Sequence, residues 1–227
     1  MSQLVLLDLS AAFDTVDHQV LLCVLSDRFG ISGTALNWFE SYLSDRTQSF
    51  VHTGHPTAYF PVTCNVPQGS VFGPLGFSAY TDDVTAVSDR HNVHSHMYAD
   101  DTQLYDSSSL SDAESVRDRL TSCVSEVAKW CASRRLQLND DKTEMIWFGS
   151  RSNLAKLQRI NLSLQVGTSN IQPSSVVLDL GVYIDSELTM KEHVVKIAAA
   201  CFYHIVVCAR FVVGSSGKSH SSWSWRS

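Results

Sequence analysis

The sequence has few basic residues: 17 Lys and Arg stand against 23 Asp and Glu in 227 residues, giving a formal net charge of -6. Proteins that bind nucleic acid on their own normally carry a basic face. The acidic balance therefore argues against autonomous, tight binding of nucleic acid. A function that involves nucleic acid would therefore need another source of positive charge.

Paired cysteines and a secretory signal are also lacking. The six cysteines lie far apart without a Cys-x-x-Cys pair, so we expect reduced, mostly buried thiols. His91, His94 and His96 cluster, but no partner at metal-finger spacing accompanies them, and a zinc site is not expected. The apolar run before the tail is interrupted by His204 and Arg210 and is too short to span a bilayer, so no membrane partner is expected.

What is present is a globular composition with 44% hydrophobic residues, enough for one large domain or one domain with an appendage. Apolar periodicity predicts a mixture of strands and helices along the chain. The expected strands cover 4–9, 47–53, 58–65, 92–98, 102–105, 145–148, 160–166, 176–178 and 180–184, and residues 55–57 are expected to separate the two strands of a hairpin, 47–53 and 58–65. The expected helices cover 18–25, a segment after Ser32, 75–87, a long segment after Ser111 with an apolar stripe along one face, and 191–205.

Asp100 and Asp101 stand between two short runs that predict the strands of a hairpin. A two-residue hairpin turn normally uses Asn-Gly or Asp-Gly, so Asp-Asp is poor turn chemistry, and such lapses often mark functional sites. Two neighbouring carboxylates repel each other unless a cation neutralises them, and all-oxygen ligands select hard ions such as Mg²⁺. For an isolated pair, an exposed acidic turn is the commoner alternative.

A second acid, Asp8, interrupts the apolar run 4–9 and is expected on a buried strand. An ionised group there is costly unless it is paired, hydrogen-bonded or bound to metal, whereas the alternative is an acid at a fraying strand end. Asp14 and Asp17 are expected in turn and capping roles. The competing pair Asp82-Asp83 is expected on a helix, where neighbouring side chains diverge by about 100°, so we interpret it as solvated surface.

The segment 66–70 (VPQGS) combines stiffness with access to the backbone. Pro67 restricts the chain, Gly69 lets a ligand approach it, and Gln68 and Ser70 can form hydrogen bonds. This composition is typical of a segment that contacts a ligand.

From residue 4 to about 204 the sequence resembles the reverse transcriptase domain of non-LTR (LINE-type) retrotransposons. The resemblance lies in five ordered blocks: 7–14 (LDLSAAFD), 66–75 (VPQGSVFGPL), 98–101 (YADD), 138–144 (LNDDKTE) and 180–185 (LGVYID). The tetrapeptide alone is weak, but five blocks in the right order are specific.

The resemblance implies an α+β fold, a right-hand polymerase palm whose antiparallel sheet carries the carboxylates and packs on helices. It implies an RNA-directed DNA polymerase that joins a dNTP to a primer 3′-hydroxyl, with an RNA template and a DNA primer as partners. Asp8 and Asp100 would hold two Mg²⁺ ions, with Mn²⁺ as the alternative metal and Asp101 as the less direct ligand. No other small-molecule cofactor is implied, and the family suggests a cytoplasmic and nuclear cycle.

The same resemblance assigns further roles. Phe13 would lie under the sugar of the incoming nucleotide, although anchoring a turn in the core is a nearly equal alternative. Pro67, Gln68 and Gly69 would contact nucleotide or template, and Tyr98 would pack near the primer end. Lys142 would protonate or neutralise pyrophosphate, the alternative being an ordinary surface lysine.

The expected organisation is a palm over 1–150, the palm end and part of a thumb connection over 151–205, and a divergent, disordered tail over 206–227. Fingers and most of the thumb are expected to be missing, so activity of these residues alone is not expected. A non-catalytic remnant or partner-binding module derived from a retroelement is the alternative. A metal-dependent phosphatase or nuclease would use the same carboxylates but leaves Pro67-Gln68-Gly69 unexplained.

Overall fold

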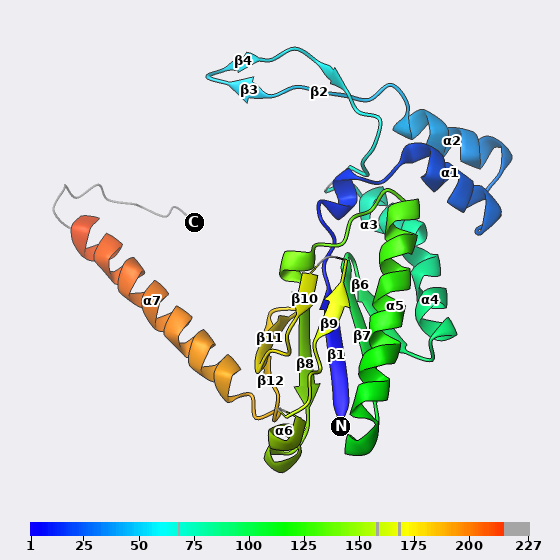
Figure 1. Ribbon diagram of the computed structural model, residues 1–227. Helices are drawn as coiled ribbons and strands as arrows, with labels where there is room; N and C mark the ends of the chain where they lie inside the picture. Colours follow the sequence, from blue (N-terminus) through cyan, green and yellow to red (C-terminus); the bar gives the residue numbers. More distant parts are fainter. Residues whose placement is uncertain (68, 158, 168, 216–227) are drawn as a thin grey trace, which may run out of the picture. The chain divides into compact units, whose positions relative to one another are not determined.

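The structure, a computed structural model, describes residues 1–67, 69–157, 159–167 and 169–215, with side chains described as far as Ala209 (Figure 1). The chain divides into two compact units, Met1–Ser175 and Val176–Ser227. Each unit is described by itself.

A four-stranded antiparallel sheet forms the centre of the first unit. Its strand order is β6-β7-β1-β8, and every neighbouring pair is antiparallel. The strands are β1 (Ser2–Leu7), β6 (His94–Tyr98), β7 (Asp101–Ser107) and β8 (Glu144–Phe148). The first strand of the chain therefore lies inside the sheet, as its apolar composition predicts.

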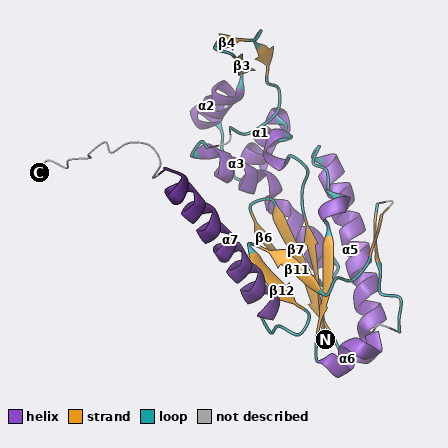
Figure 2. Cartoon of the chain, turned by 90° about the vertical axis from the view of Figure 1, so that its left-hand side faces the viewer, coloured by secondary structure: helices purple, strands orange, loops and turns teal. Residues whose placement is uncertain are grey.

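The two faces of the sheet differ in burial because side chains alternate along each strand. On β1, Val5 and Leu7 are buried, whereas Leu4 and Leu6 are half-buried. The buried face packs on α5 (Ala113–Ser133), which lies along one side of the sheet in Figure 2. Every residue of the predicted apolar stripe on this helix is in the core or packed against it: Val116, Leu120, Cys123, Val124, Val127 and Trp130. The predicted α+β fold with an antiparallel sheet on helices is confirmed.

Between β1 and the central hairpin, three helices pack together: α1 (His18–Asp27), α2 (Gly33–Leu43) and α3 (Phe72–Thr81). The side chain of Asp17 accepts a hydrogen bond from Val20 N at 3.0 Å, so its predicted capping role is confirmed.

A thin hairpin arm follows α2 and extends away from α1 and α2 (Figure 1). Strands β2 (Thr47–Gln48) and β5 (Phe60–Pro61) pair near its base, and β3 (Val51–His52) pairs with β4 (His55–Pro56) at its tip. The turn is Thr53-Gly54, with φ angles of 50° and 82°. Our sequence reading placed the turn at 55–57 and was wrong, because Gly54 supplies the positive φ that Pro56 cannot.

Shorter elements complete the first unit. Strand β9 packs on α5 and pairs with β10. These elements are η1 (Ala12–Asp14), η2 (Asp82–Val84), α4 (Thr85–Arg90), η3 (Leu110–Asp112), η4 (Asp140–Lys142), α6 (Arg151–Leu157), β9 (Leu164–Val166) and β10 (Ser169–Ile171).

The second unit contains an antiparallel pair, β11 (Val176–Asp179) and β12 (Val182–Asp185), followed by α7 (Lys191–Ser215). The helix continues past the expected end at Ile205. Residues 216–227 lie outside the described part of the chain, so the proposed organisation into palm, thumb connection and tail stays a prediction.

Length and composition alone would allow α7 to cross a membrane. The stretch Lys191–Ala209 has a mean hydropathy of 1.4 over its best window, and none of that window is buried. This corrects our interpretation that the run is too short, although a single such helix is weak evidence for a membrane span.

Candidate active site

The carboxylates predicted to be catalytic lie at one end of the central sheet. The register of β1 with β7 ends at the pair Leu7 and Thr102. Asp8 directly follows Leu7 and Asp101 directly precedes Thr102, so both acids lie at this end of the sheet. Both residues belong to the half-buried face, because they alternate with the buried Leu7 and Thr102. The fold thus brings two acids that are far apart in the sequence to the same end of the sheet.

Asp100 reaches the same end of the sheet through the β6–β7 turn. The last strand pair is Tyr98 with Asp101, which leaves Ala99 and Asp100 as the two turn residues. Our reading of Asp-Asp as the turn was therefore wrong by one residue. Ala99 has φ 54°, a left-handed conformation that costs roughly 1–2 kcal/mol for a residue with a Cβ. Strain of this kind occurs often at functional sites.

Asp8 has a buried oxygen that is only partly satisfied. Its Oδ2 accepts no hydrogen bond from the described residues, but Lys142 Nζ lies 3.2 Å away. The side chain of Lys142 is 66% exposed, against 23% for Asp8. The backbone holds this arrangement, because Asn139 N donates to the carbonyl oxygen of Asp8 at 2.9 Å and η4 follows at once. The predicted catalytic lysine is thus positioned beside a predicted metal ligand.

A buried carboxylate oxygen without a hydrogen-bond donor suits a hard cation, so Asp8 fits the role of metal ligand. Within the described ranges, no group of three His, Cys, Asp or Glu side chains is gathered closely enough to hold a metal ion. Within the histidine cluster, the Nε2 atom of His91 lies 2.6 Å from Oε2 of Glu126.

Phe13 and Tyr98 have different surroundings. The Phe13 ring stacks on Phe77 with centroids 4.6 Å apart and packs against the core, which supports the anchoring alternative for this residue. The Tyr98 ring is 63% exposed and lies across the strand pair from Asp101, on the same face. Tyr98 is therefore accessible to a ligand beside the carboxylates.

The segment around Pro67 is tied to the loop that follows Asp8. Val66 N donates to the carbonyl oxygen of Phe13 at 2.9 Å. The Pro67 carbonyl then accepts from Ser70 Oγ at 2.7 Å, and Gly73 must lack a side chain because a Cβ there would meet that carbonyl at 2.7 Å. Gly69 has φ 78° and is exposed. Gln68 lies outside the described residues.

Sequence reasoning missed Tyr80, a fully buried tyrosine on α3. Its hydroxyl donates to the carbonyl oxygen of Arg134 at 2.5 Å and accepts from Asp17 N at 3.4 Å. Burial raises its pKa above the usual value. Tyr80 thus joins three segments: the start of α1, helix α3 and the end of α5. A lone tyrosine in an apolar helix carries no sequence signal for this role.

Salt bridges strengthen the same junction. Arg135 Nη1 lies 2.6 Å from Asp17 Oδ2, and Arg134 Nη2 lies 2.6 Å from Asp83 Oδ2. Asp82 also pairs with Arg28 at 2.6 Å. The interpretation of Asp82-Asp83 as solvated surface holds for Asp82, which is exposed, but not for Asp83, which is half-buried and pairs with Arg134.

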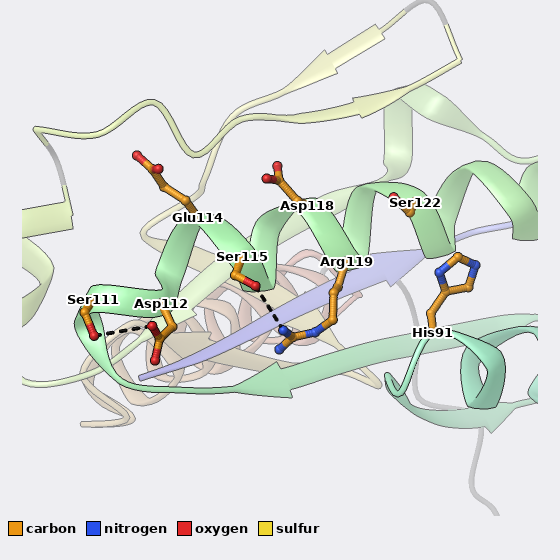
Figure 3. Close-up of a pocket in the computed structure, with 8 residues that line it drawn as sticks. All are labelled: His91, Ser111, Asp112, Glu114, Ser115, Asp118, Arg119 and Ser122. Carbon is orange, nitrogen blue, oxygen red and sulfur yellow. Dashed lines mark hydrogen bonds between the residues drawn. The ribbon is translucent and has the colours of Figure 1, made fainter.

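Two of the cavities lined by described residues are large enough to hold a ligand, and both lie outside the carboxylate site. One, of about 800 Å³, is bordered by Thr15, His18, Leu43, Cys64 and Arg135. The other, of about 550 Å³, lies along the start of α5, where Ser115 bonds Arg119 and Ser111 bonds Asp112 (Figure 3). Neither is lined by any residue predicted to bind metal, nucleotide or template.

Comparison with known proteins decides the family. The family described as "Reverse transcriptase (RNA-dependent DNA polymerase)" matches residues 2–199. The chain belongs to this family. The resemblance of this reverse transcriptase domain to LINE-type elements is confirmed by curated relatives from Drosophila melanogaster.

The first relative is the RNA-directed DNA polymerase from mobile element jockey, 29% identical over 86% of this chain and 21% of that protein. The second is the probable RNA-directed DNA polymerase from transposon BS, 28% identical over 87% of this chain and 22% of that protein. This reverse transcriptase domain thus spans about one fifth of the length of these relatives.

Solved structures support the fold. Apo telomerase from Candida tropicalis, truncated from its C-terminal domain, matches 84% of this chain and 35% of its own, with a TM-score of 0.57 and 12% identity. Telomerase from Candida albicans, in complex with a TWJ fragment of telomeric RNA, matches 83% of this chain and 31% of its own, with a TM-score of 0.56 and 13% identity. At this identity the likeness concerns the fold alone.

Proposed function

We propose that this chain carries the nucleotidyl-transfer site of an RNA-directed DNA polymerase, with Asp8 and Asp100 as ligands of two Mg²⁺ ions. The observation that carries the proposal is the β1–β7 register, which brings Asp8 and Asp101 to the same end of the sheet beside the strained Ala99-Asp100 turn. The buried Oδ2 of Asp8 adds to it, because this oxygen accepts no hydrogen bond from the described residues and has the Lys142 ammonium 3.2 Å away. Mn²⁺ has the same preference for oxygen ligands and is the natural probe of the site.

The reaction joins a dNTP to the 3′-hydroxyl of a DNA primer, as directed by an RNA template, and releases pyrophosphate. Divalent ions, when bound, activate the hydroxyl and neutralise the charge of the leaving group. Asp8 and Asp100 hold the ions, while Asp101, at the same end of the sheet, is the less direct ligand and adds negative charge to the site. Lys142, beside Asp8, offers the ammonium group that neutralises or protonates pyrophosphate.

The remaining predicted residues bind and orient substrates. Tyr98, exposed on the carboxylate face, packs against the primer end. Phe13, which is held in place by its stack on Phe77, lies under the sugar of the incoming nucleotide. Pro67, Gln68 and Gly69 lie on the segment that is tied to Phe13 and contact nucleotide or template. In a longer polymerase, other segments supply the basic residues that this acidic chain lacks.

A chimera tests the proposal in the context of a full-length polymerase. Residues 2–199 replace the matched segment of the jockey polymerase, and primer extension is measured on poly(rA) with oligo(dT) and Mg²⁺. The chimera should extend the primer, and Asp100→Asn should lower the rate about 10²-fold or more. The matched control Asp89→Asn, an exposed acid on α4, should leave it unchanged.

A chimera that melts cooperatively yet does not extend the primer would contradict the proposal. So would an Asp100→Asn chimera as fast as its parent. Either result would favour the alternative of a non-catalytic remnant.

A further inference from the structure

Three planar side chains form a row along α2 and the residues just after it. Trp38 and Tyr42 are four residues apart, on one helix face, and their rings stack with centroids 5.4 Å apart and an interplanar angle of 12°. The guanidinium of Arg46 lies 5.4 Å from the centroid of the Tyr42 ring. We call Trp38, Tyr42 and Arg46 the α2 stack.

The outer member of the α2 stack is unusually accessible. Trp38 is 57% exposed, whereas tryptophan is highly buried on average. The face of α2 that packs on the core consists of Leu36, Phe39 and Leu43, which lie in the core or pack against it. Packing of the helix therefore does not require Trp38, and its ring remains available to a ligand.

The α2 stack is continuous with the segment proposed to contact template or nucleotide. The Tyr42 and Phe72 rings pack edge to face, with centroids 5.7 Å apart. The Phe39 ring also packs on Phe72, with centroids 5.0 Å apart. Phe72 opens α3 and follows Gly69 by three residues. Phe72 therefore links the α2 stack to Gly69, and a nucleic-acid strand that passes Gly69 could continue onto the stack.

We propose that the α2 stack binds unpaired bases of the RNA template strand. This inference rests on the proposed polymerase function and names a contact for its template. Single-stranded nucleic acid binds through bases stacked on aromatic rings, with arginine adding charge and cation–π attraction. A flat tryptophan face backed by a second ring and a guanidinium supplies these groups in one row.

Charged side chains are sparse around the α2 stack. Among the residues of α2, only Glu40 is charged, and Arg46 follows as a cation beside Asp45. The Arg46 guanidinium can attract a phosphate, and the aromatic rings supply the stacking part of the contact.

Binding of the intact chain to a fluorescein-labelled, unstructured RNA of about 15 nucleotides tests the inference by fluorescence anisotropy, without metal or dNTP. Trp38→Ala should weaken binding roughly tenfold, since stacking on one base is worth about a factor of ten or more. Trp38→Phe, which keeps a planar ring, should restore most of the affinity. Tyr203→Ala, at an exposed tyrosine on α7, should leave it unchanged.

An abasic strand of equal length separates stacking from charge. The parent chain and Trp38→Ala should bind it equally, because it offers no base. The inference would be overturned if the parent and Trp38→Ala bound RNA equally well, or if the parent showed no measurable RNA binding. It would also be overturned if Trp38→Ala lost the same affinity for the abasic strand as for RNA. Self-association lost with Trp38→Ala, at unchanged RNA affinity, would assign the surface to a protein contact. None of these results touches the primer-extension test, so failure of the stack and failure of the proposed function are distinguishable.

Discussion

Lys142 and Asp8 form an ion pair at the end of the sheet, with Nζ 3.2 Å from Oδ2. The oxygen that Lys142 approaches is the one that accepts no hydrogen bond from the described residues. An ammonium group therefore lies where a divalent ion would approach Asp8. The pair links two roles proposed for the site, metal binding and neutralisation of pyrophosphate.

Removal of this ammonium should have opposite effects on metal binding and on catalysis. Lys142→Ala is expected to strengthen Mn²⁺ binding by up to about fivefold, because an exposed ion pair is worth at most about 1 kcal/mol. The same change should slow primer extension by the chimera. Mn²⁺ titration followed by electron paramagnetic resonance measures the first effect. Lys156→Ala, at an exposed lysine on α6, is the control, and weaker Mn²⁺ binding in Lys142→Ala would contradict the account.

Tyr80→Phe should destabilise the chain by about 1–3 kcal/mol, because the Arg134 carbonyl and the Asp17 amide lose a buried partner. Urea unfolding measures the loss, with Tyr203→Phe on the exposed face of α7 as control. A Tyr80→Phe chain as stable as its parent would show that the junction does not depend on this hydroxyl.

The same tyrosine gives a pH dependence with a defined sign. Burial raises the pKa of Tyr80 in the folded state above its ordinary value near 10. Its contribution to stability is complete below pH 10 and declines as the pH rises through the folded-state pKa, because the unfolded state loses its proton first. Tyr80→Phe should therefore flatten the loss of stability above pH 10. An identical alkaline slope in both proteins would contradict this.

The six thiols should divide into two classes. Cys123 and Cys131 are buried on α5, where burial raises the thiol pKa to about 11 and about 12, whereas the others are exposed. Our sequence expectation of mostly buried thiols was thus wrong for Cys23, Cys64, Cys201 and Cys208. A disulfide reagent at pH 8 should modify four cysteines rapidly and the remaining two only after unfolding. Rapid modification of all six would contradict the burial of α5.

Sequence patterns predicted the elements that carry their own periodicity. The apolar run containing Val5 became the inner strand β1, and the stripe on α5 became the core face of that helix. The same run was expected to include Asp8, but β1 ends at Leu7, so Asp8 follows the strand and is half-buried, as in the strand-end alternative. These features depend on local alternation, which one sequence shows.

Features that depend on register or on distant partners could not be predicted. Alternation locates two strands of a hairpin but does not fix the turn between them, so Asp101 was assigned to the turn instead of Ala99. The partners of Asp83 and the bonds of Tyr80 come from residues more than 50 positions away. The hairpin arm after α2 carries short strands whose residues are all exposed, so an alternation of buried and exposed positions does not mark them.

Mn²⁺ binding to the intact chain tests the central claim most directly, because it asks whether Asp8 and Asp100 hold a metal without requiring the rest of a polymerase. The account predicts that Asp8→Asn and Asp100→Asn each weaken binding at least about tenfold, whereas Asp89→Asn leaves it unchanged. Equal Mn²⁺ affinity in all four proteins would contradict the assignment of these carboxylates as a metal site.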